Sequence, residues 1–205
     1  LGLIVATSGD FGMALTYAFI FVIMAWAGGV KKRWFLLAIV VCVIGAVLIW
    51  PHISDKYFAR RITVVIDHIM GNTETISEQT QGQGFQQTRS ILALGSGQVF
   101  GKGYLHGSMT QSGHASTLPA RHTDFIFAVC GEELGMVGCL ALLLLLALVI
   151  LRCLWVARNA SSPFHAYVAV GMAGMLIIQI AANVGMCLFI FPVMGLTLPL
   201  SLIHI

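Results

Sequence analysis

Charged residues are scarce in this sequence. Only 9% of its 205 residues are Asp, Glu, Lys or Arg, whereas an ordinary soluble domain contains roughly 25%. Hydrophobic residues make up 58%, and the formal net charge is only +3, spread along the chain. A charge this small and scattered indicates neither a nucleic-acid-binding surface nor a disordered tail. The composition therefore predicts an integral membrane protein with no nucleic-acid partner.

Cysteine pairs and metal-binding spacings are also lacking. The five cysteines lie in apolar stretches, and no two of them form a C-x-x-C pair. The histidines of the polar central region show neither H-x-x-x-H nor H-E-x-x-H spacing. The sequence therefore predicts no disulfide framework and no zinc site.

The two ends of the sequence lack the marks of a whole chain. Leu1 stands where a start methionine would be, and no signal-peptide pattern follows it. Residues 200–205 read LSLIHI, which is also the translation of a widely used transposase sequencing adapter. We therefore expect an internal fragment with a non-native tail at 200–205.

Four apolar segments have, or nearly have, the roughly 20 residues that a helix needs to cross a bilayer. They are residues 11–30, 34–50, 134–156 and 164–191. A short turn joins the first two, which predicts a transmembrane hairpin within 1–50, and the last two predict a second hairpin within 124–199. Residues 51–123 carry most of the charge, and we expect them to form one large extramembrane loop.

The short turns predict the orientation of these spans. Positively charged short connections stay on the cytoplasmic side, whereas long loops translocate largely regardless of charge. One turn carries the basic cluster 31–33, and the other carries Arg152 and Arg158. Because the spans alternate in direction, the two turns fall on one face, and the loop 51–123 is expected on the opposite, extracellular face.

Two segments of that loop have a recognisable pattern. Apolar residues recur at helical spacing from Ile53 to Ile69, with Arg60 and Arg61 among the charged residues between them. This predicts an amphipathic helix at the membrane surface. Residues 88–103 begin apolar and end rich in glycine, so their backbone can approach a ligand or re-enter the membrane edge. They do not form a phosphate loop, since Lys102 is not followed by Ser or Thr.

Asp124 is the sharpest candidate for chemistry. It follows Arg121 and His122 and precedes a hydrophobic helix, so it lies at a membrane boundary, where ionisable groups are costly. Desolvation there would raise the pKa of the carboxyl, which suits a general base, and Arg121 would hold it ionised. The alternative is a helix N-cap, since Asp before an apolar run is a common start signal. The two roles are compatible.

Four further polar residues lie in the apolar region. Glu132 and Glu133 are adjacent and therefore point about 100° apart on a helix, so they cannot form a facing carboxylate pair. We expect one of them to pair with a basic partner inside the bundle. Asn183 lies one turn after Gln179, which predicts hydrogen bonds between helices.

Together, these motifs resemble the SEDS family (shape, elongation, division and sporulation), whose members include RodA, FtsW and SpoVE. Residues 10–12, Asp-Phe-Gly, resemble its Pro-Asp-Leu-Gly-Thr helix start, and residues 90–107 resemble its Gly-Ser-Gly-Gly…Gly-Lys-Gly loop. Residues 118–138, LPARHTDFIFAVCGEELGMVG, are similar to its most specific signature, and 183–199 resemble the late helix and proline-rich turn. The Leu-His-Gly after Gly-Lys-Gly resembles RodA more than FtsW.

The resemblance implies an all-α integral membrane fold in the bacterial cytoplasmic membrane. The fold would be a multi-span helical bundle with a large extracellular loop, and this chain would supply about four spans of a ten-helix parent. The sequence departs from the family pattern at Gly9, Met13, Gln98 and Ala120, where the family usually has Pro, Thr, Gly and Glu.

The resemblance also implies a peptidoglycan glycosyltransferase that polymerises lipid II into glycan strands for cell-wall elongation, division and shape. Such proteins usually work with a class B penicillin-binding protein. Asp124 corresponds to the family's essential loop aspartate, which implies a general base, or a positioner of the acceptor and of a divalent cation, Mg or Mn. His122 would orient Asp124. The candidates for binding the pyrophosphate of the undecaprenyl-linked substrate are the basic residues Lys102, Arg121, Arg60 and Arg61.

Other functions stay open at this point. The basic residues would also suit contacts with membrane lipid headgroups. A flippase for lipid-linked precursors would share the fold and the affinity for a pyrophosphate lipid, and discontinuous helices with polar centres would favour it. A non-catalytic scaffold for a transpeptidase would tolerate replacement of Asp124.

Overall fold

The computed structural model describes residues 11–41, 57–70, 84–110 and 118–199. In these ranges every regular element is a helix, namely α2 (Phe11–Ala27), α4 (Tyr57–Met70), α6 (Phe85–Gly97), α7 (Ile126–Arg158) and α8 (Pro163–Cys187). Residues 32–41 are also helical. The helix start at Asp10, the rest of the span 34–50 and the proposed tail at 200–205 lie outside the described residues.

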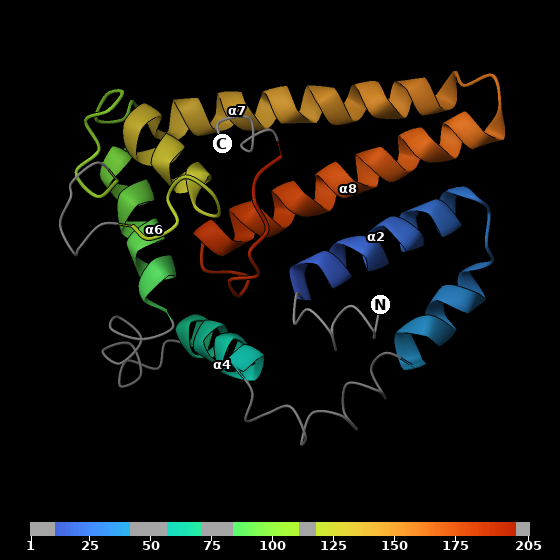
Figure 1. Cartoon of the computed structure of the whole chain (residues 1–205), viewed down its shortest axis with the longest axis horizontal. Helices are drawn as coiled ribbons and strands as arrows, with labels where there is room; N and C mark the ends of the chain where they lie inside the picture. Colours follow the sequence, from blue (N-terminus) through green and yellow to red (C-terminus); the bar gives the residue numbers. More distant parts are fainter. Residues whose placement is uncertain (1–10, 42–56, 71–83, 111–117, 200–205) are drawn as a thin grey trace.

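The helices α7 and α8 form the long axis of the molecule. They contain 33 and 25 residues, and both are long and apolar enough to cross a membrane, whereas α2 has only 17 residues. They lie side by side, and α2 packs along α8 (Figure 1). Leucines on the outer side of α7 remain exposed, for example Leu144 at 63%. The all-helical fold class is confirmed, and this apolar surface is what a lipid environment requires.

Glycines bring α2 and α8 together. A Cβ atom placed on Gly174 of α8 would lie 3.0 Å from Cδ1 of Ile23, and one on Gly171 would lie 3.2 Å from the sulfur of Met24. Small residues of this kind let two helix backbones approach closely, which is the main source of helix association in lipid. The helix α2 of the first predicted hairpin therefore docks onto α8, the second helix of the other hairpin.

Two short turns lie at one end of the bundle. The turn after α2 passes through Gly29, whose φ is +76°, and leads into the helical residues 32–41. The turn after α7 ends at Ser162, whose hydroxyl accepts a hydrogen bond from the backbone N–H of His165, with Pro163 at the first position of α8. Figure 1 shows both turns at the same end, with α6 and the start of α7 at the other.

The amphipathic segment predicted from Ile53 to Ile69 is helical over its described part, α4. Val65 is buried, whereas Ile66 and Ile69 are exposed. The ring of His68 stacks on Phe189 with centroids 4.1 Å apart. This helix therefore packs against the segment that follows α8.

Candidate functional site

The helix α7 is broken near its start, at Gly135. The backbone there has φ 68° and ψ −167°, a conformation that only glycine adopts readily. A Cβ atom at this position would lie 2.3 Å from the backbone nitrogen of Gly101. Gly135 is therefore required both by its own conformation and by the close approach of the loop that follows α6.

The loop after α6 satisfies the backbone groups that the break frees. Four hydrogen bonds join the two segments: from Lys102 N–H to Glu132 O at 2.9 Å, from Gly103 N–H to Glu133 O at 3.0 Å, from Met136 N–H to Gln98 O at 3.0 Å and from Val137 N–H to Val99 O at 3.2 Å. Unpaired backbone groups are very costly in a membrane. The glycine-rich segment that was expected to approach a ligand or re-enter the membrane edge thus approaches α7.

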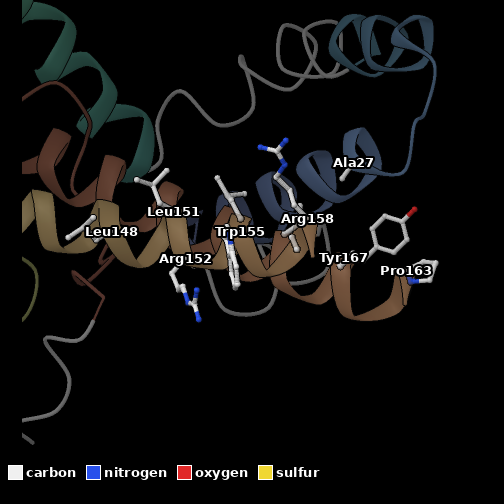
Figure 2. Close-up of a pocket in the computed structure, with 12 residues that line it drawn as sticks. Ala27, Leu148, Leu151, Arg152, Trp155, Arg158, Pro163 and Tyr167 are labelled. Carbon is white, nitrogen blue, oxygen red and sulfur yellow. The ribbon is translucent and has the colours of Figure 1, made fainter. Parts of the chain in front are cut away.

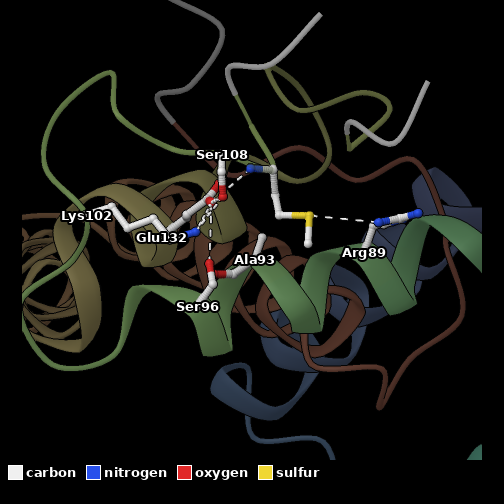
Figure 3. Close-up of polar contacts among 7 residues, drawn as sticks. Arg89, Ala93, Ser96, Lys102, Ser108 and Glu132 are labelled. Atoms are coloured by element: carbon white, nitrogen blue, oxygen red, sulfur yellow. Dashed lines mark hydrogen bonds and ion pairs between the residues drawn. The ribbon is translucent and has the colours of Figure 1, made fainter. Parts of the chain in front are cut away.

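A buried ion pair lies beside the break. Glu132 is fully buried, and its Oε1 accepts hydrogen bonds from Lys102 Nζ at 2.8 Å and from the backbone N–H of Met109 at 2.9 Å (Figure 3). The Lys102 ammonium also donates to the hydroxyl of Ser108 at 2.7 Å. Glu133 accepts a hydrogen bond from the backbone N–H of Leu105 at 3.1 Å. The prediction that one of the two glutamates pairs with a basic residue inside the bundle is confirmed.

Asp124 lies just before α7, outside the helix. The helix begins at Ile126, its N-cap residue is Phe125, and no side chain caps it. The helix-cap interpretation of Asp124 is therefore wrong, because the cap falls on a fully buried aromatic residue. The carboxyl group of Asp124 is available for other interactions.

Three parts of the chain meet around Asp124. Burial raises the pKa of its carboxyl above the usual value, and the Thr123 hydrogen bond and the positive charge of Arg61 partly offset this effect. Arg61 comes from α4, and its guanidinium donates a hydrogen bond to the carbonyl of Val193. The fully buried Asn183 of α8 donates to the backbone carbonyl of Asp124 at 2.8 Å.

The second hydrogen bond of Asn183 explains how α8 contributes to this arrangement. Its amide also donates to the carbonyl of Leu196 at 2.8 Å, so one side chain ties the segment before α7 to the segment after α8. The prediction that Asn183 makes hydrogen bonds between helices is therefore corrected, since the partners that its amide contacts are backbone carbonyls outside the helices.

Comparisons with known proteins identify the family. The chain matches the FtsW/RodA/SpoVE cell cycle protein family over residues 1–201. This chain belongs to the SEDS family. It is 36% identical over 198 residues to the peptidoglycan glycosyltransferase MrdB of Escherichia coli K12, covering 97% of this chain and 50% of that protein. It is 30% identical over 199 residues to the probable peptidoglycan glycosyltransferase FtsW of Bacillus subtilis 168, covering 96% and 47%.

A solved structure gives the same result. The SEDS chain is similar, with a TM-score of 0.70 and 26% identity, to a chain described under the structural coordination of polymerization and crosslinking by a peptidoglycan synthase complex. The match covers 98% of this chain and 51% of the other. The chain thus spans about half the length of the curated relatives and of the solved chain that it matches, and its helices belong to a membrane fold.

The SEDS signature brings together only some of the residues expected to form the site. Arg61 supplies the positive charge that acts on Asp124, a role that sequence analysis had given to Arg121. Arg121 turns instead toward the neighbouring loop, where it donates to the carbonyl of Thr110 and, from Nε, to His122 Nε2 at 3.0 Å.

The other two basic candidates are Lys102 and Arg60. Lys102 forms the ion pair with Glu132, and its side chain remains 30% exposed. Arg60 lies in α4, but its side chain is outside the described residues.

Sequence analysis missed the anchors of α6. Ser90 is fully buried and donates to the carbonyl of Cys187 at 3.0 Å, and Gln87 donates to the carbonyl of Phe191 at 2.7 Å. The two side chains lie one turn apart on α6, and they donate to carbonyls at the end of α8 and in the segment that follows it. The signal for this contact in the sequence was the spacing of Gln87 and Ser90. Two polar residues three positions apart lie on the same side of a helix that is otherwise apolar there.

Proposed function

We propose that the full-length SEDS protein is a peptidoglycan glycosyltransferase that polymerises lipid II into glycan strands for cell-wall growth and cell shape. The observation that carries the proposal is the environment of Asp124. It is a carboxyl of raised pKa beside a cation from another helix, in a chain that aligns over 97% of its length with a protein named peptidoglycan glycosyltransferase.

In this proposal Asp124 is the general base. The acceptor sugar hydroxyl gives its proton to the Asp124 carboxylate as its oxygen attacks the anomeric carbon of the donor. The bond between that carbon and the pyrophosphate breaks, and undecaprenyl pyrophosphate leaves with the electron pair. A raised pKa makes the carboxylate a stronger base, while the charge of Arg61 keeps a fraction of it ionised.

The cations are proposed to stabilise the negative charge of the departing pyrophosphate. Charge-assisted hydrogen bonds from Arg and Lys suit this role, and Arg61 is placed best, since it already acts on Asp124. Arg60, Arg121 and Lys102 are further candidates. His122 accepts a hydrogen bond from Arg121. We therefore propose that His122 positions the Arg121 guanidinium, in addition to orienting Asp124.

The alternative role for Asp124 is that of a positioner, in which its carboxylate would hold a divalent cation, Mg or Mn, instead of accepting the proton. Magnesium is commonly bound by one or two carboxylates together with substrate phosphates and water. Asp124 is the carboxylate that fits this pattern, and the pyrophosphate would complete the ligand set. The cation would neutralise charge on the phosphates. Removal of divalent ions with EDTA should then abolish polymerisation, and added Mg or Mn should restore it.

The remaining parts of the proposal concern partners and orientation. The solved neighbour comes from a complex that couples polymerization with crosslinking, which supports a class B penicillin-binding protein as the partner of the full-length protein. We place the loop 51–123 on the extracytoplasmic face of the bacterial cytoplasmic membrane, because both short basic turns lie at the other end of the bundle (Figure 1).

One observation favours the flippase alternative. The helix α7 is discontinuous at Gly135 beside the buried Glu132, as transport sites often are. In transporters such breaks leave polar groups free to bind a substrate. Here the loop after α6 occupies the freed backbone groups, and Lys102 neutralises Glu132. The break therefore supports glycosyl transfer more than transport, because it anchors the loop beside the site.

The test is lipid II polymerisation by the full-length protein with its class B partner. Asp124→Asn should abolish polymer formation while the variant elutes as a folded protein in size-exclusion chromatography. Asp67→Asn, the same chemical change on α4, is the matched control and should keep most of the activity. Polymer made by folded Asp124→Asn would remove the carboxylate from the mechanism. Lipid II flipping by reconstituted protein that makes no polymer would favour the transport alternative.

A further inference from the structure

A groove lies at the end of the bundle remote from Asp124. It has a volume of about 890 Å³ and is formed by the last turns of α7, the first turns of α8 and the end of α2 (Figure 2). Most of its lining is aliphatic, including Leu148, Leu151 and Leu154 of α7 and Ala166 of α8. An apolar groove on the outer surface of a membrane bundle has the dimensions and chemistry to hold an acyl chain.

The rim of this groove is basic and aromatic. Arg152 and Arg158 both line it, three residues before and three residues after Trp155 on α7, and Figure 2 shows their guanidinium groups on opposite sides of this helix. The Arg152 guanidinium carbon lies 4.3 Å from the centroid of the Trp155 ring, a cation–π contact that holds the charge at the rim. Tyr167 adds a second amphipathic ring, as is typical of the membrane–water interface.

The sequence supplies no carboxylate to neutralise these cations. None of the eight Asp and Glu residues lies between residues 11 and 54 or between 134 and 205. The basic turn 31–33 lies at the same end of the bundle (Figure 1), whereas the part of α7 that carries Glu132 and Glu133 lies at the other end. An anion bound at this end would therefore be attracted by several positive charges.

We propose that this groove binds an anionic phospholipid, with its phosphate at the basic rim and an acyl chain in the aliphatic part. Basic pockets between transmembrane helices are suited to anionic headgroups. A free phosphate would leave the apolar groove empty, whereas a zwitterionic lipid would leave the arginines without net compensation. Charge and apolar surface together therefore require an amphiphilic anion. This site is independent of the proposed glycosyl transfer.

The test is native mass spectrometry of the full-length protein in detergent, titrated with phosphatidylglycerol or phosphatidylcholine. The wild type should retain phosphatidylglycerol preferentially. Arg152→Gln with Arg158→Gln should weaken its binding about 25-fold, the product of a roughly fivefold effect from each cation near an anionic headgroup. Lys31→Gln with Arg33→Gln removes the same charge at the same end outside the groove and should change binding less than twofold.

A second variant separates charge from folding. Arg152→Lys with Arg158→Lys keeps both charges and should retain most of the binding, and thermal unfolding in detergent should show all variants folded. Equal losses in the two glutamine pairs, equal retention of both lipids, or competition by millimolar glycerol 3-phosphate would each overturn the proposal. So would a wild-type protein that retains no lipid because other helices fill the groove.

Discussion

Two acidic side chains of the SEDS signature have different environments, and the difference decides their roles. Glu132 is fully buried, and Lys102 neutralises it at 2.8 Å, so it stabilises the loop after α6. Asp124 lies outside α7, and burial raises the pKa of its carboxyl, with only a partial offset from Arg61. A carboxylate in a raised-pKa environment without a neutralising ion pair is the one suited to accept a proton.

The pKa of Asp124 leads to a prediction about pH. A base must be ionised, so the rate of polymerisation should fall as the pH decreases through the raised pKa of this carboxyl. Arg61→Gln removes a charge that lowers the pKa, so the acid limb of the kcat/KM profile should move to higher pH. Arg61→Lys should leave the limb in place. A uniform loss of rate without displacement of the limb would contradict this role of Arg61.

The ion pair leads to a prediction about stability. Lys102→Met would leave Glu132 buried without its countercharge, which costs about 3–5 kcal/mol when one member of a buried pair is removed. Glu132→Gln should cost less, because the Lys102 side chain is 30% exposed and its charge can reach water. Thermal unfolding of the full-length variants in detergent measures the order. A larger loss for Glu132→Gln would show that the Lys102 side chain is desolvated as well.

At the scale of elements, the break in α7 is the feature on which the site depends. It turns the first part of the helix, which carries both glutamates, against the loop after α6, and the backbone of that loop pairs with both sides of the break. The geometry requires glycine at Gly135. It also requires glycine at Gly101 of the loop, where φ is +78° and a Cβ atom would lie 2.2 Å from the Glu133 carbonyl oxygen. Loop and helix are therefore held by main-chain contacts that tolerate no side chain.

Replacement of these glycines gives a direct test. Gly135→Ala should destabilise the protein by at least about 2 kcal/mol, because alanine is strained at this φ and ψ, and its Cβ would meet the loop backbone at 2.3 Å. The matched control is Gly95→Ala on α6, where no atom lies within 4 Å of the added Cβ. That change should stabilise the helix by up to about 1 kcal/mol. Similar unfolding temperatures for the two variants would show that the break is not a requirement of the fold.

At the scale of the whole molecule, the arrangement separates two chemistries. Asp124, Arg61 and the loop after α6 belong to one end of the bundle, and the basic turns and the groove of Figure 2 belong to the other. The apolar outer surface of α7 lies between them. This separation is what a protein needs when it performs chemistry at one membrane surface and is held in place by charge at the other.

The separation predicts a labelling pattern. In the full-length protein without its native cysteines, Phe100→Cys should react with a membrane-impermeant maleimide added to intact spheroplasts, since Phe100 is 84% exposed at the loop end. Ser161→Cys, in the turn after α7, should react only after permeabilisation. Labelling of both positions from outside, or the reverse pattern, would contradict the orientation drawn from the short basic turns.

Several parts of the site followed from local sequence, and others did not. The turn at Gly29 and the amphipathic helix α4 follow from the spacing of glycine and apolar residues. The pairing of a signature glutamate was also predictable, since a buried carboxylate needs a partner. The position of the helix start was not, because Asp124 looks like a cap and only the packing of Phe125 in the core excludes it.

The amino-acid sequence by itself determined the membrane class, the helical hairpins and the family, because apolar runs and motif order are properties of neighbouring residues. Only the tertiary structure decided which cation acts on Asp124. Arg61 and its hydrogen-bond partner Val193 are separated by 132 positions, and Asn183 reaches Asp124 across 59. Contacts of this kind depend on how helices dock, and docking is set by shape and by the need to satisfy buried polar groups. No local pattern encodes that choice.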